Sequence, residues 1–147
     1  MANLSNVTVA VVATNGFEDS ELTSPVEAVK NAGAEVHIVS TNSGSIKGKN
    51  GTEVSVDKTT SEAKADDYTA LLLPGGTENA DTIRVDEDAV ALVKALVEAG
   101  KPTGVICHGG WILTESDLVR GRKLTSVKNV KTDLKNAGAD WVDEEVV

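Results

Sequence analysis

Cysteine is almost absent from this chain of 147 residues, because Cys107 is the only one. A single cysteine cannot form an intramolecular disulfide, so nothing in the sequence points to an oxidising compartment. Aromatic residues make up only 3% of the chain, which leaves Val, Leu, Ile and Ala to fill the core. The length suits one domain with a single continuous core, and 40% hydrophobic residues is normal for a globular protein.

Basic residues are outnumbered as well, with 14 Lys and Arg against 23 Asp and Glu and a net charge of −9. Nucleic acids and anionic membrane surfaces bind clustered basic residues, so neither is expected as a partner. No apolar run approaches the roughly 20 residues that a membrane-spanning helix needs. The first residues also lack the basic region and cleavage site of a signal peptide. We therefore expect a cytoplasmic protein.

Short apolar runs alternate with amphipathic segments along the whole chain. Strands are expected over 7–13, 35–41, 68–73, 103–106, 122–126 and 141–147, helices over about 20–31, 86–100, 109–119 and 127–139, and a hairpin with an Asn-Gly turn over 44–60. Ser20 or Ser24 would cap the first helix, with Pro25 in its first turn. Strands and helices in alternation predict a doubly wound α/β fold, with a mostly parallel sheet and helices on both faces.

Ligands of such folds bind at the carboxyl ends of the strands, where the sequence places one cysteine and several acids. The segment "VICHG" has the features of a nucleophile elbow, with a strand before Cys107 and Gly109 two residues after it. Val105, two residues before, is larger than an elbow normally has. A following helix N-terminus and a charge partner would lower the pKa of the thiol. The alternative is a small buried cysteine without chemistry, and the motif alone leaves both readings open.

Three further groups are candidates for the same edge of the sheet. Glu18, in the loop after the first strand, would share a proton with Cys107, unless it is a solvated or helix-capping acid. "PGG" would aim the Gly76 N–H into the pocket, and with the His108 N–H it would form an oxyanion hole, unless it is a plain turn. His37 is interpreted as a satisfied core residue. No metal-ligand spacing or dinucleotide loop is present, so no cofactor is expected.

The sequence resembles the PfpI family, often called intracellular protease I, of the class I glutamine-amidotransferase-like superfamily. The resemblance covers essentially the whole chain and rests on "NGFEDSELTSPVEAVKNAGAEVHIVS", "LLLPGG", "GVICHGGWIL", "LVRGRKLTS" and "KTDLKNAGADWVDEEVV". It implies a flavodoxin-like α/β fold, with Cys107 as the nucleophile, Glu18 hydrogen-bonded to it and His108 as the adjacent histidine. It also implies a homodimer or a hexamer built from dimers, in which Asp81 of a neighbouring subunit would orient His108.

Two features depart from the family pattern. The family usually reads "CHGP" where this chain has Gly110, which loosens the start of the helix but leaves the nucleophile intact. Members normally continue past "DEEVV" with a further strand turn and a C-terminal helix. We therefore expect one PfpI-like domain over residues 1–147 without those elements. The absence of a histidine after His108 excludes the glutaminase triad, in which the histidine lies far downstream.

Three functions remain open at this stage. The first is a cofactor-independent cysteine enzyme acting on reactive carbonyls, as a glyoxalase or a deglycase of modified proteins and peptides, in stress protection. The second is an intracellular cysteine peptidase, which needs an oriented His108 as base. The third is a redox-sensing or chaperone-like stress protein without turnover, whose accessible thiol would oxidise readily.

Overall fold

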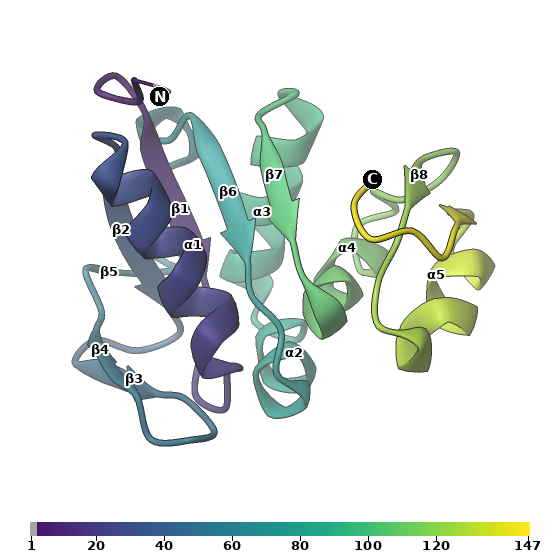
Figure 1. Cartoon of the computed structure of the whole chain (residues 1–147), viewed down its shortest axis with the longest axis horizontal. Coiled ribbons are helices and arrows are strands. Elements are labelled where there is room, and N and C mark those ends of the chain that lie inside the picture. Colours follow the sequence, from purple (N-terminus) through teal and green to yellow (C-terminus); the bar gives the residue numbers. More distant parts are fainter. Residues whose placement is uncertain (1–2) are drawn as a thin grey trace.

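A computed structural model describes residues 3–147 of the chain, and its centre is a five-stranded parallel sheet (Figure 1). The strands lie in the order β5-β2-β1-β6-β7. Their bounds are Thr8–Val12 for β1, Glu35–Ser40 for β2, Lys58–Thr59 for β5, Ala70–Leu73 for β6 and Thr103–Val105 for β7. From β1 the chain adds β2 and β5 on one side of the sheet and then β6 and β7 on the other. The carboxyl ends of β1, β6 and β7 lie at the same edge of the sheet. The predicted parallel sheet is confirmed.

Helices cover both faces of this sheet, with α1 (Asp19–Asn31) in front and α3 (Glu87–Glu98) behind in Figure 1. The alternation of side chains along β1 explains the two layers, because successive residues of a strand point to opposite faces. Val9 and Val11 pack in one apolar cluster with Leu22 of α1. Val12 packs in the other cluster with Leu92 of α3. Both faces are therefore buried, as the continuous apolar run predicted.

The predicted hairpin is also confirmed, although it is shorter than expected. Strands β3 (Ser45–Lys47) and β4 (Glu53–Ser55) pair antiparallel, with Ile46 opposite Val54. The segment after them does not extend the hairpin. It forms β5, which pairs parallel with β2 at the edge of the main sheet. The hairpin itself lies outside the sheet, next to the carboxyl end of β1 (Figure 1).

The segment after Cys107 departs most from the expected elements. The helix expected over 109–119 is a four-residue 3-10 turn, Cys107–Gly110, followed by α4 (Trp111–Thr114). The helix expected over 127–139 is a 3-10 turn, Lys128–Val130, followed by α5 (Lys131–Asn136). The final strand expected over 141–147 is wrong, since β9 (Asp140–Trp141) pairs only with β8 (Lys123–Leu124), in a separate two-stranded sheet. Residues 143–147 are exposed, because three consecutive acids interrupt the apolar residues and leave no apolar face to bury.

Two further differences lie in the first half. Helix α1 begins at Asp19 with Glu18 as its N-cap, so Ser20 and Ser24 are inside the helix and Pro25 is in its interior. The helix therefore begins earlier than expected, and Asp19 and Glu21 lie in its first turn. A short helix, α2 (Thr77–Ile83), and a 3-10 turn, Ala65–Asp67, were not expected from the sequence.

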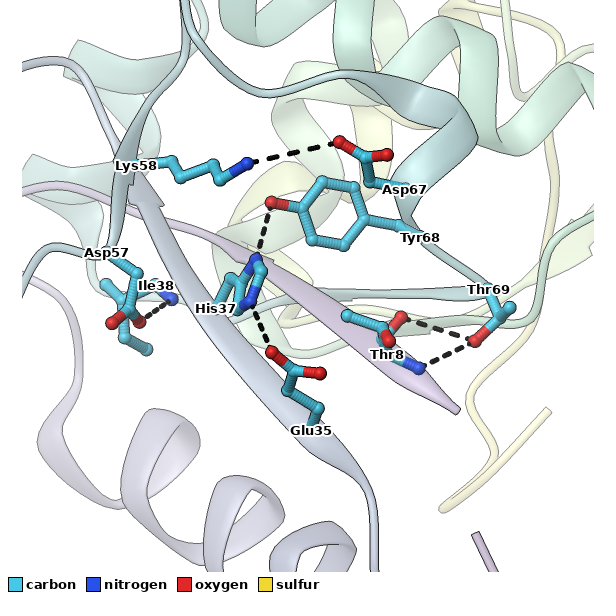
Figure 2. A network of polar contacts seen from close by, with 9 residues as sticks. All are labelled: Thr8, Glu35, His37, Ile38, Asp57, Lys58, Asp67, Tyr68 and Thr69. Atoms are coloured by element: carbon cyan, nitrogen blue, oxygen red, sulfur yellow. Dashed lines mark hydrogen bonds and ion pairs between the residues drawn. The ribbon is translucent and has the colours of Figure 1, made fainter. Parts of the chain in front are cut away.

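His37 is held in a network of polar contacts between β2 and the segment before β6, shown in Figure 2. Its Nδ1 lies 2.9 Å from the Tyr68 hydroxyl, and its Nε2 lies 2.9 Å from a carboxylate oxygen of Glu35. Burial of Tyr68, with the nearby charges of Asp67 and Asp57, raises the pKa of its hydroxyl to about 12. His37 therefore has partners for both ring nitrogens, as expected of a structural histidine.

Candidate active site

Cys107 lies directly beyond the end of β7, on a sharp turn from strand to helix. Ile106 is still extended, and Cys107 then takes a φ of 59°. Positive φ is uncommon for residues other than glycine and costs roughly 1–3 kcal/mol, so the surrounding structure must impose it. The side chain is partly buried, and its sulfur lies at the edge where the strands end. The expected nucleophile elbow is therefore present in the backbone geometry.

Two glycines make room for this turn. A Cβ at Gly109 would lie 2.4 Å from the carbonyl oxygen of Leu73, closer than real Cβ contacts approach. A Cβ at Gly75 would lie 2.8 Å from the Cβ of Cys107 and 2.3 Å from a carboxylate oxygen of Glu21. The close packing of the elbow against the end of β6 thus explains why small residues flank it.

The carboxylate beside the thiol belongs to Glu21, and this corrects the expected hydrogen-bond partner, Glu18. Glu21 lies next to the Cys107 side chain, since a Cβ at Gly75 would meet both, and it accepts a hydrogen bond of 2.8 Å from the Gly75 N–H. Glu18 is the N-cap of α1, and its carboxylate forms an ion pair with Lys49. Glu21 lies one helical turn further along α1, which brings it to the same side as Glu18.

The electrostatics of the elbow oppose a free thiolate. Burial raises the pKa of the Cys107 thiol first, and the charge of Glu21 raises it further, together with their hydrogen bond and the charge of Glu18. The backbone N–H of His108 acts in the opposite direction and lowers the pKa of the thiol. Burial also raises the pKa of Glu21. The direction is opposite to the lowered thiol pKa expected of the elbow, because burial and then the charges of Glu21 and Glu18 act against ionisation. Cys107 and Glu21 form a coupled pair.

His108 turns its ring back toward the thiol that precedes it. Its Nδ1 lies 3.4 Å from the sulfur of Cys107, and its Nε2 lies 3.5 Å from the hydroxyl of Thr77, the first residue of α2. Its ring meets the Trp111 ring edge to face, with centroids 5.7 Å apart. Asp81 is exposed on α2 and makes no hydrogen bond or ion pair with His108 within residues 3–147. Its expected role across an interface stays a prediction.

The candidate oxyanion hole involves the turn after β6. Gly76 has a φ of 91° and is the N-cap of α2. Its N–H has no acceptor among the residues that the structure describes, whereas the neighbouring Gly75 N–H is held by Glu21. The Gly76 N–H is therefore available, and its pairing with the His108 N–H around an oxyanion stays a prediction.

Asn79 of α2, only 1% exposed, fixes the turn that carries these glycines. Its amide nitrogen donates to the carbonyls of Pro74 (3.2 Å) and Gly75 (3.0 Å). Its amide oxygen accepts a hydrogen bond of 2.7 Å from the Thr14 N–H, in the loop after β1. One buried side chain thus ties two loops of the site together, and no sequence motif indicated it.

Asn79→Ala is expected to lower the free energy of unfolding by roughly 2–4 kcal/mol, since it leaves buried backbone groups without partners. Urea unfolding of the variant measures the loss. Thr82→Ala, at an exposed position of the same helix, is the matched control and should change stability by less than about 0.5 kcal/mol. Equal stability of both variants would show that water replaces the Asn79 hydrogen bonds.

Cys107 also lines a cleft of about 1050 Å³, which extends along β7 to the last residues of the chain. Leu72 and Val105 contribute apolar surface, and Lys123 and Ser126 contribute polar groups. Among residues 3–147, no group of three or more His, Cys, Asp or Glu side chains is placed to hold a metal ion. Over the same residues, no helix is long and apolar enough to cross a membrane.

A parallel α/β sheet with a cysteine elbow, an adjacent histidine and a partly buried glutamate defines a class of cysteine-dependent α/β proteins. Residues 7–147 match the model of the DJ-1/PfpI family, and the chain belongs to that family. The resemblance to PfpI proteins that the sequence motifs indicated is therefore confirmed.

Among curated proteins, the chain is similar to Deglycase TK1284 of Thermococcus kodakarensis, with 44% identity over 95% of this chain and 83% of the relative. It is 45% identical to Protein/nucleic acid deglycase 2 of Escherichia coli, over 95% of this chain and 81% of the relative. General stress protein 18 of Bacillus subtilis is 43% identical, over 95% of this chain and 81% of the relative.

Solved structures agree on the fold. A two-domain protein of Anabaena variabilis, with DJ-1/ThiJ/PfpI-like and ferritin-like domains, superposes with a TM-score of 0.93 and 36% identity, covering 96% of this chain and 41% of that one. DJ-1 of Schizosaccharomyces pombe superposes with a TM-score of 0.84 at 24% identity, over 96% of this chain and 78% of that one, which speaks for the fold alone.

Proposed function

We propose that the chain is a cofactor-independent, cysteine-dependent deglycase of the PfpI type, which removes carbonyl adducts from modified amines. The observation that carries this proposal is the Cys107 thiol on a strained elbow, next to the partly buried carboxylate of Glu21. Proton transfer between a nucleophile and an adjacent base is what addition to a carbonyl requires. Relatives at 44–45% identity that are named deglycases support the same activity.

The chemistry divides between three groups of the site. The sulfur of Cys107 bonds to the carbon that was the aldehyde of methylglyoxal, its proton passes to Glu21, and the amine leaves with a proton. The Gly76 and His108 N–H groups stabilise the oxyanion on the neighbouring carbon. A proton shift between the two carbons, with Glu21 as the carrier, gives a thioester, and water then releases lactate and regenerates the thiol. One adduct and one water give one amine and one lactate.

The names of the similar deglycases favour an adduct on a modified amine over methylglyoxal alone as the substrate. Free methylglyoxal would still react by the same steps, which makes glyoxalase activity a secondary expectation.

The decisive experiment is lactate release from an N-acetylarginine adduct of methylglyoxal by the purified chain. Wild type is expected to release lactate and free N-acetylarginine in equal amounts, and Cys107→Ser is expected to release neither above the spontaneous rate. Intact mass after iodoacetamide treatment confirms that the thiol of the wild type is accessible. Equal release by wild type and Cys107→Ser would refute the deglycase proposal and favour a redox-sensing or chaperone-like protein.

Peptide-bond hydrolysis is the second candidate, and one contact supports it. The Nδ1 of His108 lies 3.4 Å from the sulfur, within reach for a base. A peptidase also needs a group that orients the imidazolium, and the Thr77 hydroxyl at 3.5 Å is a weaker partner than a carboxylate. Cleavage of a fluorogenic peptide that is lost in His108→Ala would establish this activity.

We further propose a homodimer or a hexamer built from dimers, and a cytoplasmic location. The oligomer follows from the family resemblance, in which Asp81 of a neighbouring subunit orients His108. Light scattering after size exclusion gives the mass of the assembly. A monomer at micromolar concentration would leave Thr77 as the partner of His108.

A further inference from the structure

The tip of the β3–β4 hairpin is fixed against the loop that precedes α1. The Lys49 N–H donates to the carbonyl of Phe17 at 2.9 Å, and the Gly16 N–H donates to the carbonyl of Lys47 at 2.9 Å. Phe17 is fully buried, so the loop beneath the hairpin belongs to the core. The hairpin, which lies outside the main sheet, is therefore a fixed part of the site.

Asp19 locks the same turn from the other side. Its two carboxylate oxygens accept hydrogen bonds of 2.9 Å from the N–H groups of Asn50 and Thr52. Hydrogen bonds from Thr52 and Asn50 lower the pKa of Asp19 to about 2. A Cβ at Gly48 would lie 2.6 Å from the Asp19 carboxylate, so the turn passes close to α1. The backbone that carries Lys49 thus has little freedom.

The side chain of Lys49 points from this fixed turn to the acids of the active site. Its ammonium forms an ion pair with the carboxylate of Glu18, whose side chain is 23% exposed. Glu18 stands at the N-cap of α1, one turn before Glu21, and its N–H donates to the carbonyl of Gly75 at 3.2 Å. Lys49 therefore brings a positive charge to a group of three acids, formed by Glu18, Glu21 and Cys107.

We propose that Lys49 is a positioning residue of the catalytic site: by pairing with Glu18 it neutralises the field of that carboxylate at the thiol, so that Glu21 alone exchanges the proton of Cys107. The inference rests on the proposed function only in assuming that the proton of Cys107 is transferred during the reaction. Without Lys49, two carboxylates of similar charge would act on the sulfur, and ionisation of the thiol would cost more.

The direction of the charge effects agrees with this role. The hydrogen bond and charge of Glu18 raise the pKa of Lys49, and the charges of Glu21 and Cys107 raise it further. Interaction between two titrating groups is mutual, so Lys49 favours the ionised forms of Glu21 and Cys107. Asp19 is the remaining acid of this loop, and its carboxylate is held by the hairpin backbone.

The test measures the rate of Cys107 alkylation by iodoacetamide against pH, which needs no substrate. Lys49→Met is expected to move the profile to higher pH and to slow alkylation at pH 7 by about threefold to tenfold, the size expected of a partly exposed charge pair. Lys49→Arg should restore the wild-type profile. Lys47→Met removes the same charge from an exposed position of the same hairpin and should leave the profile unchanged.

A double-mutant cycle decides whether Lys49 acts through Glu18. In a Glu18→Gln background the effect of Lys49→Met should shrink to less than half, because the charge to be neutralised is gone. A wild-type profile for Lys49→Met, or an effect of full size in the Glu18→Gln background, would overturn the proposal. Since alkylation does not depend on turnover, either result stands even if the deglycase assay fails.

Discussion

Glu21→Gln is expected to separate the reactivity of the thiol from turnover of the substrate. The charge of Glu21 and its hydrogen bond both raise the pKa of Cys107, so their removal should lower that pKa and speed alkylation at neutral pH. The same change removes the group that carries the proton, and turnover of the arginine adduct should fall by about 10²–10⁴. Alkylation and lactate release, measured against pH on the same preparation, give both quantities.

The dependence of the alkylation rate on pH shows whether Cys107 or Glu21 holds the proton that the two groups share. In the wild type, the raised pKa of Cys107 means that alkylation should increase with pH and reach its maximum above the range of an ordinary thiol. Glu27→Gln, at an exposed position of the same helix, is the matched control and should match the wild type. Slower alkylation in Glu21→Gln would contradict the prediction and place the proton on Glu21, with a thiolate at rest.

Gly76→Ala is expected to lower both the stability of the fold and the turnover of the substrate. A Cβ at Gly76 would lie 2.3 Å from the carbonyl oxygen of Gly16 and 2.6 Å from the backbone nitrogen of Glu18, and its φ of +91° is itself unfavourable for alanine. The obstacle is backbone of the loop before α1, which cannot rotate away. We expect the free energy of unfolding to fall by roughly 2–4 kcal/mol and lactate release to fall by at least about 10².

Gly44→Ala separates the two causes of that loss. Gly44 has a φ of +102°, but a Cβ there would meet nothing within 4 Å, so only the backbone strain remains. It should cost about 1 kcal/mol and leave lactate release unchanged. Urea unfolding of both variants gives the comparison. If Gly76→Ala were no less stable than Gly44→Ala, the turn after β6 would have to be free to move.

Local patterns predicted the elements that are buried on both sides. The apolar residues of β1, and those at helical spacing in α3, must face the core, because their exposure to water would cost free energy. The pattern over 141–147 has no such constraint. Three consecutive acids separate its valines, and Val146 is 81% exposed, so the apolar residues there are not buried against another element. Helix α2 was not predicted because Ala80 and Ile83 are its only buried apolar residues, too few for a recognisable helical pattern.

The partner of the thiol could be predicted only in part. The sequence correctly placed an acidic loop at the edge of the sheet where Cys107 lies. Which carboxylate of that loop reaches the thiol depended on where α1 begins. Because the helix starts at Asp19, Glu21 lies in its first turn and faces the elbow, while Glu18 caps the helix and meets Lys49. Residue propensities do not locate the end of a helix to within one or two residues, so the sequence could not decide between Glu18 and Glu21.

The sequence by itself determined the α/β fold, the position of Cys107 at the end of a strand and the family, because these follow from hydrophobic burial and from a motif confined to neighbouring residues. Only the tertiary structure decided that Glu21 meets the thiol, that Thr77 meets His108, and that Lys49 reaches the site from a hairpin. These contacts join segments 31 to 86 residues apart. They depend on packing between elements, which no local pattern encodes.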